Sequence, residues 1–335
     1  MEILSEEKKN DVIGLGNTIM DLLIEVNDEH LENLNLNKGE FHLTNHETAT
    51  KLLQKIQQRQ FPIKKVPGGS SANALKGIAF LGGKAILCGK VGSDNHGKTY
   101  IDEMNKLGVI TRINSNSSVT GHALTFITPD AERTFSVHLG AAVELDKKDI
   151  LEQDIKNSKV LHLEGYQIEG STKETVLHAV ELARKNNTLV SIDLADPGVV
   201  RRNKEFLKEL VNSYIDIIFV NENEAKEFTG LQEKEAAKEL SKYVKIAIVK
   251  IGARGSLICQ NEKIITINSY QANAIDTTGA GDSYAAGFLY GFCKDWSLKK
   301  SGQLGALLAS KVVEQIGVEM KNFNSQQLIN SLNFQ

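Results

Sequence analysis

Residues 276–291 read DTTGAGDSYAAGFLYG, a stretch that places three small residues directly before a helical pattern. The segment DSYAAGFLYG is rich in small residues, so we expect its helix to pack closely against its neighbours. Gly279, Ala280 and Gly281 leave backbone N–H groups uncovered at the helix start, where the helix dipole adds partial positive charge. The stretch therefore predicts an anion-binding site at a helix N-terminus.

Asp282 stands at the same helix start. A carboxylate there suits a general base that takes the proton of an attacking hydroxyl, if the bound anion is a phosphoryl group in transit. The positive end of the helix dipole favours the ionised form that a base needs. The alternative is that Asp282 only caps the helix, because Asp is among the preferred capping residues.

Outward from this stretch, apolar β-branched runs alternate with amphipathic helical patterns. The runs that predict buried strands are DVIGLG, KAILCGKVG, KVLHLEG, TLVSIDL, IDIIFVN and KIAIVKIG. The helical patterns include SSANALKGIAFLGG, GKTYIDEMNKLGV, TKETVLHAVELARKNN and NKEFLKELVNSY. This alternation predicts right-handed βαβ units and an α/β fold whose mostly parallel sheet is covered on both faces.

Two stretches break the rhythm and predict a small additional sheet. Residues 18–45 insert polar–apolar alternation after the first strand. The segment VTGHALTFITPDAERTFSVHLG predicts a hairpin that turns near Pro129 and Asp130.

Length and composition set the broad class. The chain has 335 residues, 41% hydrophobic and 24% charged, which suits one large α/β domain. The formal net charge of −3 says little about partners, but the chain has no domain-wide basic excess to drive binding to a nucleic-acid backbone, so no nucleic-acid partner is expected. The charged start MEILSEEKKN and the shortness of every apolar run predict no membrane segment and a cytoplasmic location. Three widely separated cysteines, Cys88, Cys259 and Cys293, predict neither a disulfide framework nor a zinc site.

A second phosphate-site candidate is GSDNHGKT, Gly92–Thr99, which matches the P-loop pattern G-x-x-x-x-G-K-[ST]. A predicted strand precedes it and a predicted helix follows it, and Asp193 could supply a magnesium ligand. The alternative is that Gly92 and Gly97 permit a tight turn while Lys98 faces solvent.

Two long segments resemble the two signatures of the PfkB, or ribokinase-like, kinase family: GGSSANALKGIAFLGGKAILCGKVGSDNHG at 68–97 and DTTGAGDSYAAGFLYG at 276–291. The resemblance extends over about residues 10–320 and is closest to adenosine-kinase-like members. It implies one ribokinase-like domain over 1–335, a three-layer α/β/α sandwich with a small β lid from about 18–45 and 110–140. In this family VGSDNHG resembles the tail of the first signature, which makes the P-loop match a coincidence.

The resemblance implies ATP-dependent, Mg²⁺-dependent transfer of the γ-phosphoryl group to a primary alcohol. Asp282 matches the catalytic base, and Gly279, Ala280 and Gly281 match the anion hole. Asn221 and Glu224 in NENE resemble the family's N-x-x-E element, which would organise Mg²⁺, its waters and the phosphates. Taken alone, NENE is a helix start with acidic residues in its first turn.

Further nucleotide-side residues follow from the same resemblance. Lys250, Gly252 and Gly255 in KIGARG resemble the nucleotide-side loop, although by itself this segment is a turn. Arg133 could reach a phosphate when the lid closes, or it could be a solvated hairpin residue. The resemblance also allows a K⁺ or other monovalent-cation site near Asp276 and Thr278.

Candidate acceptor-binding residues come from two segments in the first quarter of the chain. Family positions that bind acceptor hydroxyls match Asn17, Asp21, Gly69 and Asn73, and carboxylates with amides can hold two neighbouring hydroxyls. The N-x-x-x-D spacing from Asn17 looks more like adenosine kinases than ribokinases.

One predicted strand face bears on the acceptor. Phe135, Val137 and Leu139 alternate in RTFSVHLG and therefore share one face of a strand. That apolar face could cover a purine ring, or it could be plain packing within the lid.

These observations predict a kinase acting on the primary hydroxyl of an adenosine-like nucleoside, as a monomer or homodimer with a small-molecule partner. Within the family the rival is a sugar kinase of the fructokinase or ribokinase type. From other classes the rivals are a P-loop NTPase using Gly92–Thr99 and a catalytically silent binding protein on the same fold.

Overall fold

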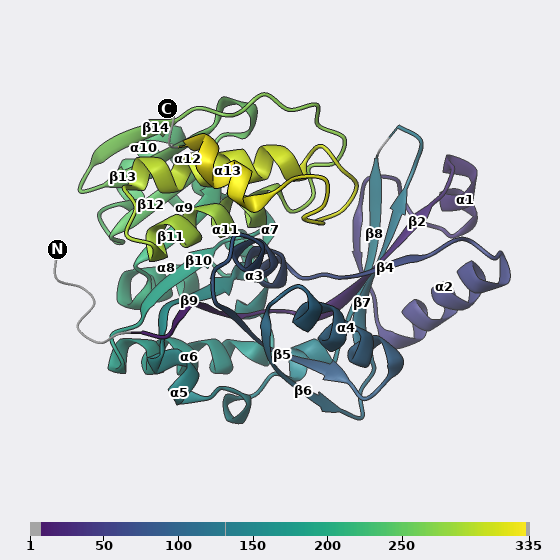
Figure 1. Ribbon diagram of the computed structural model, residues 1–335. Coiled ribbons are helices and arrows are strands. Elements are labelled where there is room, and N and C mark those ends of the chain that lie inside the picture. The colour runs from purple at the N-terminus through teal and green to yellow at the C-terminus, as the bar shows by residue number, and fades with distance from the viewer. Residues whose placement is uncertain (1–7, 131, 333–335) are drawn as a thin grey trace.

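The computed structural model describes residues 8–130 and 132–332, in which two sheets of unequal size stand side by side (Figure 1). The large sheet has nine strands in the order β14-β13-β12-β11-β10-β9-β1-β5-β6. Neighbours from β6 to β12 pair in parallel, while β13 pairs antiparallel with both β12 and β14. Its strands are β1 (Asn10–Leu15), β5 (Ala85–Gly92), β6 (Ile110–Asn116), β9 (Ser158–Glu164), β10 (Leu189–Asp193), β11 (Ile217–Asn221), β12 (Ile246–Lys250), β13 (Ser256–Gln260) and β14 (Lys263–Ile267).

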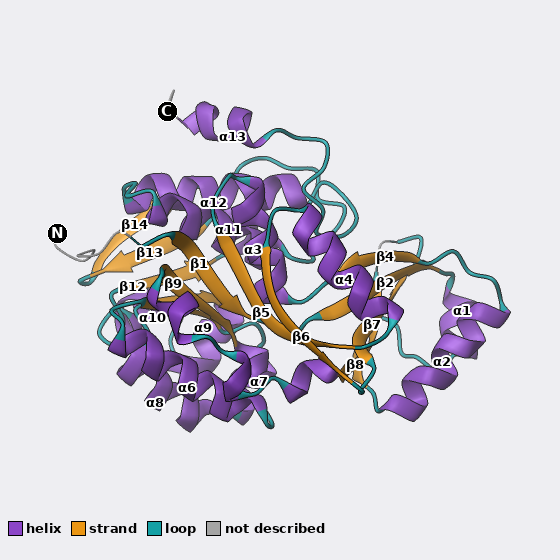
Figure 2. Cartoon of the chain, turned by 60° about the horizontal axis from the view of Figure 1, so that its bottom comes forward, coloured by secondary structure: helices purple, strands orange, loops and turns teal. Residues whose placement is uncertain are grey.

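Helices cover both faces of the large sheet (Figure 2). One face packs on α3 (Ser70–Phe80), α4 (Asn95–Lys106), α11 (Ala280–Cys293) and α12 (Leu298–Val312), with α13 (Ser325–Ser331) beyond them. The other packs on α5 (Glu152–Lys156), α6 (Thr172–Lys185), α7 (Pro197–Arg202), α8 (Lys204–Tyr214), α9 (Glu222–Thr229) and α10 (Glu233–Leu240). Successive strand residues alternate between the two cores: Phe219 faces the first and Val220 the second. This arrangement confirms the predicted three-layer α/β/α fold.

The small sheet has the order β3-β8-β7-β2-β4. Its strands are β2 (Ile19–Glu25), β3 (Phe41–Leu43), β4 (Lys64–Pro67), β7 (Thr120–Ile127) and β8 (Arg133–Gly140), and β7 and β8 form the predicted antiparallel hairpin. Its outer face buries Met20, Leu22 and Ile24 in a core shared with α1 (Asp28–Asn33) and α2 (His46–Gln58). The expected lid segments do not match it strand for strand: β4 lies outside them, and β6, inside the second, pairs with β5 in the large sheet.

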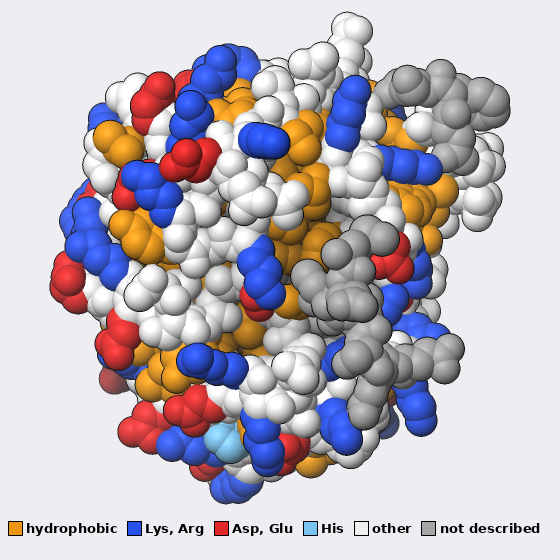
Figure 3. All heavy atoms as spheres, turned by 90° about the vertical axis from the view of Figure 1, so that its left-hand side faces the viewer, with side chains coloured by type: hydrophobic (Ala, Val, Ile, Leu, Met, Phe, Trp, Pro, Cys, Tyr) orange, Lys and Arg blue, Asp and Glu red, His pale blue; other side chains and the backbone are white. Residues whose placement is uncertain are grey.

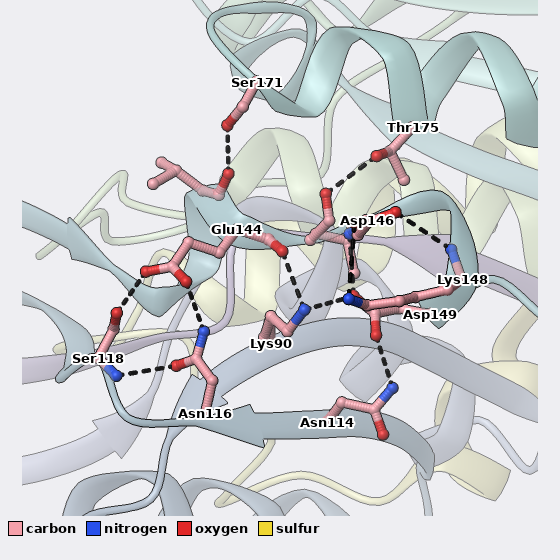
Figure 4. A network of polar contacts seen from close by, with 12 residues as sticks. Lys90, Asn114, Asn116, Ser118, Glu144, Asp146, Lys148, Asp149, Ser171 and Thr175 are labelled. Atoms are coloured by element: carbon pink, nitrogen blue, oxygen red, sulfur yellow. Dashed lines mark hydrogen bonds and ion pairs between the residues drawn. The ribbon is translucent and has the colours of Figure 1, made fainter.

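A polar network, buried at Lys90 and Asp149 and exposed at Glu144, connects the base of the β7–β8 hairpin to the large sheet (Figure 4). Lys90 on β5 donates to Asp149 Oδ2 at 2.7 Å and to the backbone oxygen of Glu144 at 3.0 Å. The Glu144 carboxylate, just after β8, accepts from Asn116 and Ser118, just before β7. The two chain crossings between the sheets are therefore tied to each other and to the large sheet.

On the face drawn in Figure 3, Lys and Arg side chains lie among Asp and Glu and do not gather in one basic patch. Within residues 8–130 and 132–332, no helix is both long enough and apolar enough to cross a membrane. Cys88, Cys259 and Cys293 are buried free thiols.

The Lys90–Asp149 pair gives a stability prediction, because both side chains are nearly inaccessible to solvent. Lys90→Met leaves the Asp149 carboxylate buried without its cation, which should lower the free energy of unfolding by about 3–5 kcal/mol. Urea denaturation followed by circular dichroism measures the loss. Lys148→Met, which removes an exposed ammonium 3.8 Å from Asp146, should leave the unfolding curve nearly unchanged. Equal losses in the two variants would contradict the assignment.

Candidate active site

The carboxyl ends of the parallel strands meet at a cleft of about 540 Å³. Residues from six segments line it: Ser70 from α3, Tyr166 after β9, Asp193 and Ala195 at and after the end of β10, Asn221 to Glu224 at β11–α9, Lys250 and Gly252 at and after the end of β12, and Gly279, Gly281 and Asp282 at the start of α11. Three segments predicted to carry site residues, at Asn221–Glu224, Lys250–Gly252 and Gly279–Asp282, thus converge on one surface.

Asp282 lies in the first turn of α11, as its sequence position predicts. Its Oδ1 accepts from Ser70 Oγ at 2.7 Å and its Oδ2 accepts from Asn73 Nδ2 at 2.8 Å. Burial raises the pKa of Asp282 to about 6, and the two donors partly oppose that rise. No side chain of α11 itself caps this helix: the N-cap is Gly279. Asp282 is thus oriented toward α3 and is available to a hydroxyl placed there.

The glycines before Asp282 are required by close approach. Gly279 has a left-handed φ of +71°, and a Cβ there would lie 2.2 Å from Val318 Cγ2. A Cβ on Gly281 would lie 2.9 Å from Lys250 Nζ. Gly279 and Gly281 line the cleft, whereas Ala280 begins the helix between them. Bare backbone therefore faces the cleft beside a lysine ammonium, as an anion site requires.

Lys250 and Asp193 form the charged floor of the cleft. Lys250 Nζ lies 2.5 Å from Asp193 Oδ2, and both side chains are largely buried. Although burial opposes it, the carboxylates of Asp193 and Glu224 raise the pKa of Lys250. Gly255 lies behind this floor: its φ of +98° closes the turn into β13, and it does not line the cleft.

Asn221 and Glu224 form a capping box at the start of α9. Glu224 Oε2 accepts from the Asn221 backbone N–H at 2.8 Å, and Oε1 accepts from Asn221 Nδ2. Burial and the nearby Asp193 raise the pKa of Glu224. Because both carboxylate oxygens already accept hydrogen bonds, this pair suits contact with a metal ion through water. Among the described residues, no group of three His, Cys, Asp or Glu side chains is arranged to hold a metal directly.

The acceptor-side residues cluster next to Asp282, outside the cleft lining. Asn73 donates a hydrogen bond to Asp282. Gly69 is the N-cap of α3 with a φ of +95°, and a Cβ there would lie 2.1 Å from the Asn17 carbonyl oxygen. The side chain of Asp21 packs on Gly68, where a Cβ would lie 2.3 Å from Asp21 Oδ1. Burial raises the pKa of Asp21 to about 6.

Strand register places the predicted lid residues on the face of the small sheet that carries Asp21. Asp21 pairs with Ala123, which pairs with Val137, so these three side chains point to the same side. Phe135 and Leu139 follow the alternation onto that side, and Leu43, paired with Val137, is 66% exposed there. Val137 is itself buried, which plain lid packing also explains.

Arg133 does not lie free at the cleft edge. Its guanidinium pairs with the Asp276 carboxylate, and both side chains are buried. Asp276 also accepts from the backbone N–H groups of Gly317 and Thr278, at 2.7 and 3.0 Å. The small sheet is therefore docked onto the loop before the anion site, and a cation at this loop would depend on oxygens other than those of the Asp276 carboxylate.

The sequence analysis did not single out Glu164, whose carboxylate binds the backbone of two segments that carry predicted acceptor residues. Its Oε1 accepts from Asn17 N–H at 3.0 Å and its Oε2 from Ser71 N–H at 2.7 Å. Burial raises the pKa of Glu164 to about 7. A usable signal was present: Glu164 ends the predicted strand KVLHLEG, and carboxyl ends of parallel strands gather at the site.

The P-loop match is structurally a helix cap. Asp94 is the N-cap of α4, and its carboxylate accepts from Gly97 N–H at 2.9 Å and from Thr120 N–H at 2.8 Å. A carboxylate thus occupies the position that a phosphate would need. A Cβ on Gly92 would lie 2.2 Å from the Ser118 carbonyl oxygen, and a Cβ on Gly97 would lie 2.1 Å from the Gly92 carbonyl oxygen. Close backbone packing therefore accounts for both glycines.

Comparison with known proteins agrees with this architecture. Residues 41–322 match the family described as pfkB family carbohydrate kinase, and the chain belongs to this family. It is 30% identical over 324 residues to a 5-dehydro-2-deoxygluconokinase of Geobacillus thermodenitrificans, covering 92% of this chain and 88% of the relative.

Two solved structures superpose over nearly the whole chain, each at 30% identity. A probable sugar kinase from Rhizobium etli has a TM-score of 0.87 and covers 98% of both chains. An adenosine kinase from Sinorhizobium meliloti has a TM-score of 0.86, with coverage of 97% and 99%. The protein is thus a phosphotransferase whose acceptor carries an alcohol group, with relatives named for sugar and nucleoside acceptors.

The pKa of Asp282 gives a pH prediction. If Asp282 is the base, it must be ionised, so kcat at saturating acceptor should fall about tenfold per pH unit below a midpoint near pH 6. Ser70→Ala removes a donor to the ionised carboxylate, so the pKa of Asp282 and the acidic midpoint should both rise. A pH–rate profile measures both.

Ser71→Ala is the matched control, because the Ser71 hydroxyl has no hydrogen-bond partner among the described residues. It should leave the midpoint in place. Superimposable profiles for Ser70→Ala and the wild type would remove Ser70 from the support of the base.

Proposed function

We propose that the protein transfers the γ-phosphoryl group of ATP to the primary hydroxyl of an adenosine-like nucleoside. The observation that carries the transfer chemistry is the position of Asp282 between the backbone of Gly279–Gly281 and the acceptor-side residues Asn73 and Asp21. A hydroxyl held beside Asp282 would lie within reach of a phosphoryl group bound at the helix N-terminus. The carboxylate would take its proton as the new P–O bond forms.

The cleft is the proposed ATP site. Gly279 and Gly281 would bind the γ-phosphoryl group through backbone N–H groups, while Lys250 and Gly252, which line the same cleft, would lie on the nucleotide side. Asn221 and Glu224 would orient the waters of Mg²⁺, which would neutralise phosphate charge when bound. Because the reaction consumes ATP, we also propose a cytoplasmic location.

The proposed acceptor contacts divide between polar and apolar groups. Asp21, Asn17 and Asn73 would hold neighbouring ribose hydroxyls, because a carboxylate accepts and an amide both donates and accepts. The apolar face on the Asp21 side of the small sheet, with the exposed Leu43 beside Val137, would cover the flat base. The 30% identity to an adenosine kinase over nearly the full chain supports this acceptor class.

A sugar acceptor is the second candidate. Val137 is already buried, so part of the apolar face serves packing, and a 30% identical relative is named as a 5-dehydro-2-deoxygluconokinase. A free sugar would use the same Asp21, Asn73 and Asp282 contacts and leave the apolar face uncovered.

An acceptor panel separates the two candidates. ATP consumption with Mg²⁺ is measured against adenosine, inosine, guanosine, cytidine, ribose, fructose and 5-dehydro-2-deoxygluconate, each as kcat/KM. We expect a nucleoside to exceed every sugar by at least about tenfold, since covering a base buries apolar area that a sugar lacks. Preference for a sugar would retain Asp282 and the anion site and remove the base pocket.

The base assignment has its own test. Asp282→Asn should lower kcat by about 10²–10⁴-fold with little change in ATP binding. Lys98→Ala is the control, because Lys98 is exposed on α4 and should leave turnover unchanged. The reverse pattern, with loss in Lys98→Ala and none in Asp282→Asn, would favour a P-loop NTPase. No turnover by the wild type with any acceptor would favour a silent binding protein.

A further inference from the structure

Lys76 is a buried lysine to which the proposed reaction assigns no function. It lies on α3, two turns after Ser70, and only 5% of its surface is exposed. Its Nζ donates to the Pro67 carbonyl at 2.7 Å and to the Val318 carbonyl at 3.5 Å. Because burying an ammonium is costly, a lysine at this point needs partners that stabilise its charge.

The Pro67 contact leads to the acceptor side. Pro67 ends β4 and pairs with Met20 on β2, next to Asp21. Gly68, the following residue, packs against the Asp21 carboxylate, and its carbonyl accepts from Tyr100 Oη at 2.9 Å. The Lys76 ammonium therefore fixes the backbone on which the Asp21 carboxylate rests.

The Val318 contact leads to the phosphoryl side. The Val318 side chain packs on Gly279, the first residue of the anion site. Its neighbour Gly317 donates to Asp276, and its other neighbour Glu319 pairs with Lys64 on β4 at 2.5 Å. Residues 317–319 thus connect the anion-site loop to the small sheet, and Lys76 is attached to them through its hydrogen bond to the Val318 carbonyl.

Three acidic groups face Lys76 from the elements packed around it: Asp21 on β2, Asp282 on α11 and Glu319 after α12. Burial lowers the pKa of Lys76 to about 8, and these carboxylates oppose the shift. Burial raises the pKa of Asp21, and two nearby cations oppose that rise. Lys76 has the larger effect and Arg133 the smaller one. Lys76 is therefore the principal counter-charge of the acceptor-side carboxylate.

We propose that Lys76 is a positioning residue for phosphoryl transfer: its ammonium keeps Asp21 ionised and ties Pro67 to Val318, which aligns the acceptor site with the anion site. The inference rests on the proposed function in one respect, the assignment of Asp21 to acceptor binding. It does not depend on whether the acceptor is a nucleoside or a sugar.

The test is the pH dependence of the acceptor KM in Lys76→Met, with the best acceptor from the panel. In the wild type this KM should double as the pH falls to about 6, where half of Asp21 is protonated. In Lys76→Met we expect that point to move up by at least about one pH unit, because Asp21 has lost its counter-charge. The KM for ATP should change by less than about twofold, since uniform loss of structure would affect both substrates. Lys76→Arg, which keeps the charge, should restore part of the wild-type profile.

Lys84→Met is the matched control, an exposed lysine shortly after the same helix, and its profile should overlay that of the wild type. A Lys76→Met profile that also overlays it would overturn the proposal. If Lys76→Met does not fold, the double variant Asp21→Asn/Lys76→Met is compared by Tm: recovery of folding supports the charge pairing, and none overturns it. Asp21→Asn alone separates the two hypotheses, because an unchanged acceptor KM in that variant would refute the acceptor assignment and not the role of Lys76.

Discussion

The contact between Asp282 and the first turn of α3 is the interaction on which the rest of the site depends. Ser70 and Asn73 hold the two oxygens of a carboxylate more than two hundred residues away in the chain. Both groups occupy the first turns of their helices, so the two helix starts are fixed relative to each other. In the proposed mechanism the start of α11 binds the phosphoryl group and the start of α3 helps to bind the acceptor, so the reaction would need the two together.

Close packing of α3 on α11 makes that contact possible. A Cβ on Gly77 of α3 would lie 2.5 Å from Ala286 Cβ on α11, and a Cβ on Gly287 would meet the backbone of Gly305 on α12 at 2.7 Å. The small residues in both sequence signatures are therefore explained by helix packing as much as by phosphate binding. Larger residues at these positions would separate the helices and lengthen the hydrogen bonds to Asp282.

Charge is distributed across the site in alternating signs. Glu164 is buried and Asp21 and Asp282 are partly exposed, and desolvation raises the pKa of all three acids. The nearby cations are Lys76, which is buried, and Lys250, which is partly exposed. Each acid would favour its protonated form without a nearby cation or donor. The acids that contact substrate in the proposed mechanism thus remain titratable near neutral pH, which suits proton transfer.

The sequence by itself determined the α/β alternation, the hairpin of the small sheet, and the placement of Asp282 beside Gly279–Gly281 at a helix start, because these depend on periodicity and on residues close together in the chain. Only the tertiary structure decided that Asp94 caps the helix inside the P-loop match and that Arg133 pairs with Asp276. It also decided that Glu164 binds the Asn17 N–H and that Lys76 binds the Pro67 carbonyl. Those contacts join residues from different strands and helices, and their partners are set by how the two sheets and α3 pack. A lone Glu at a strand end or a lone Lys on a helix has no local pattern that separates it from a solvated surface residue.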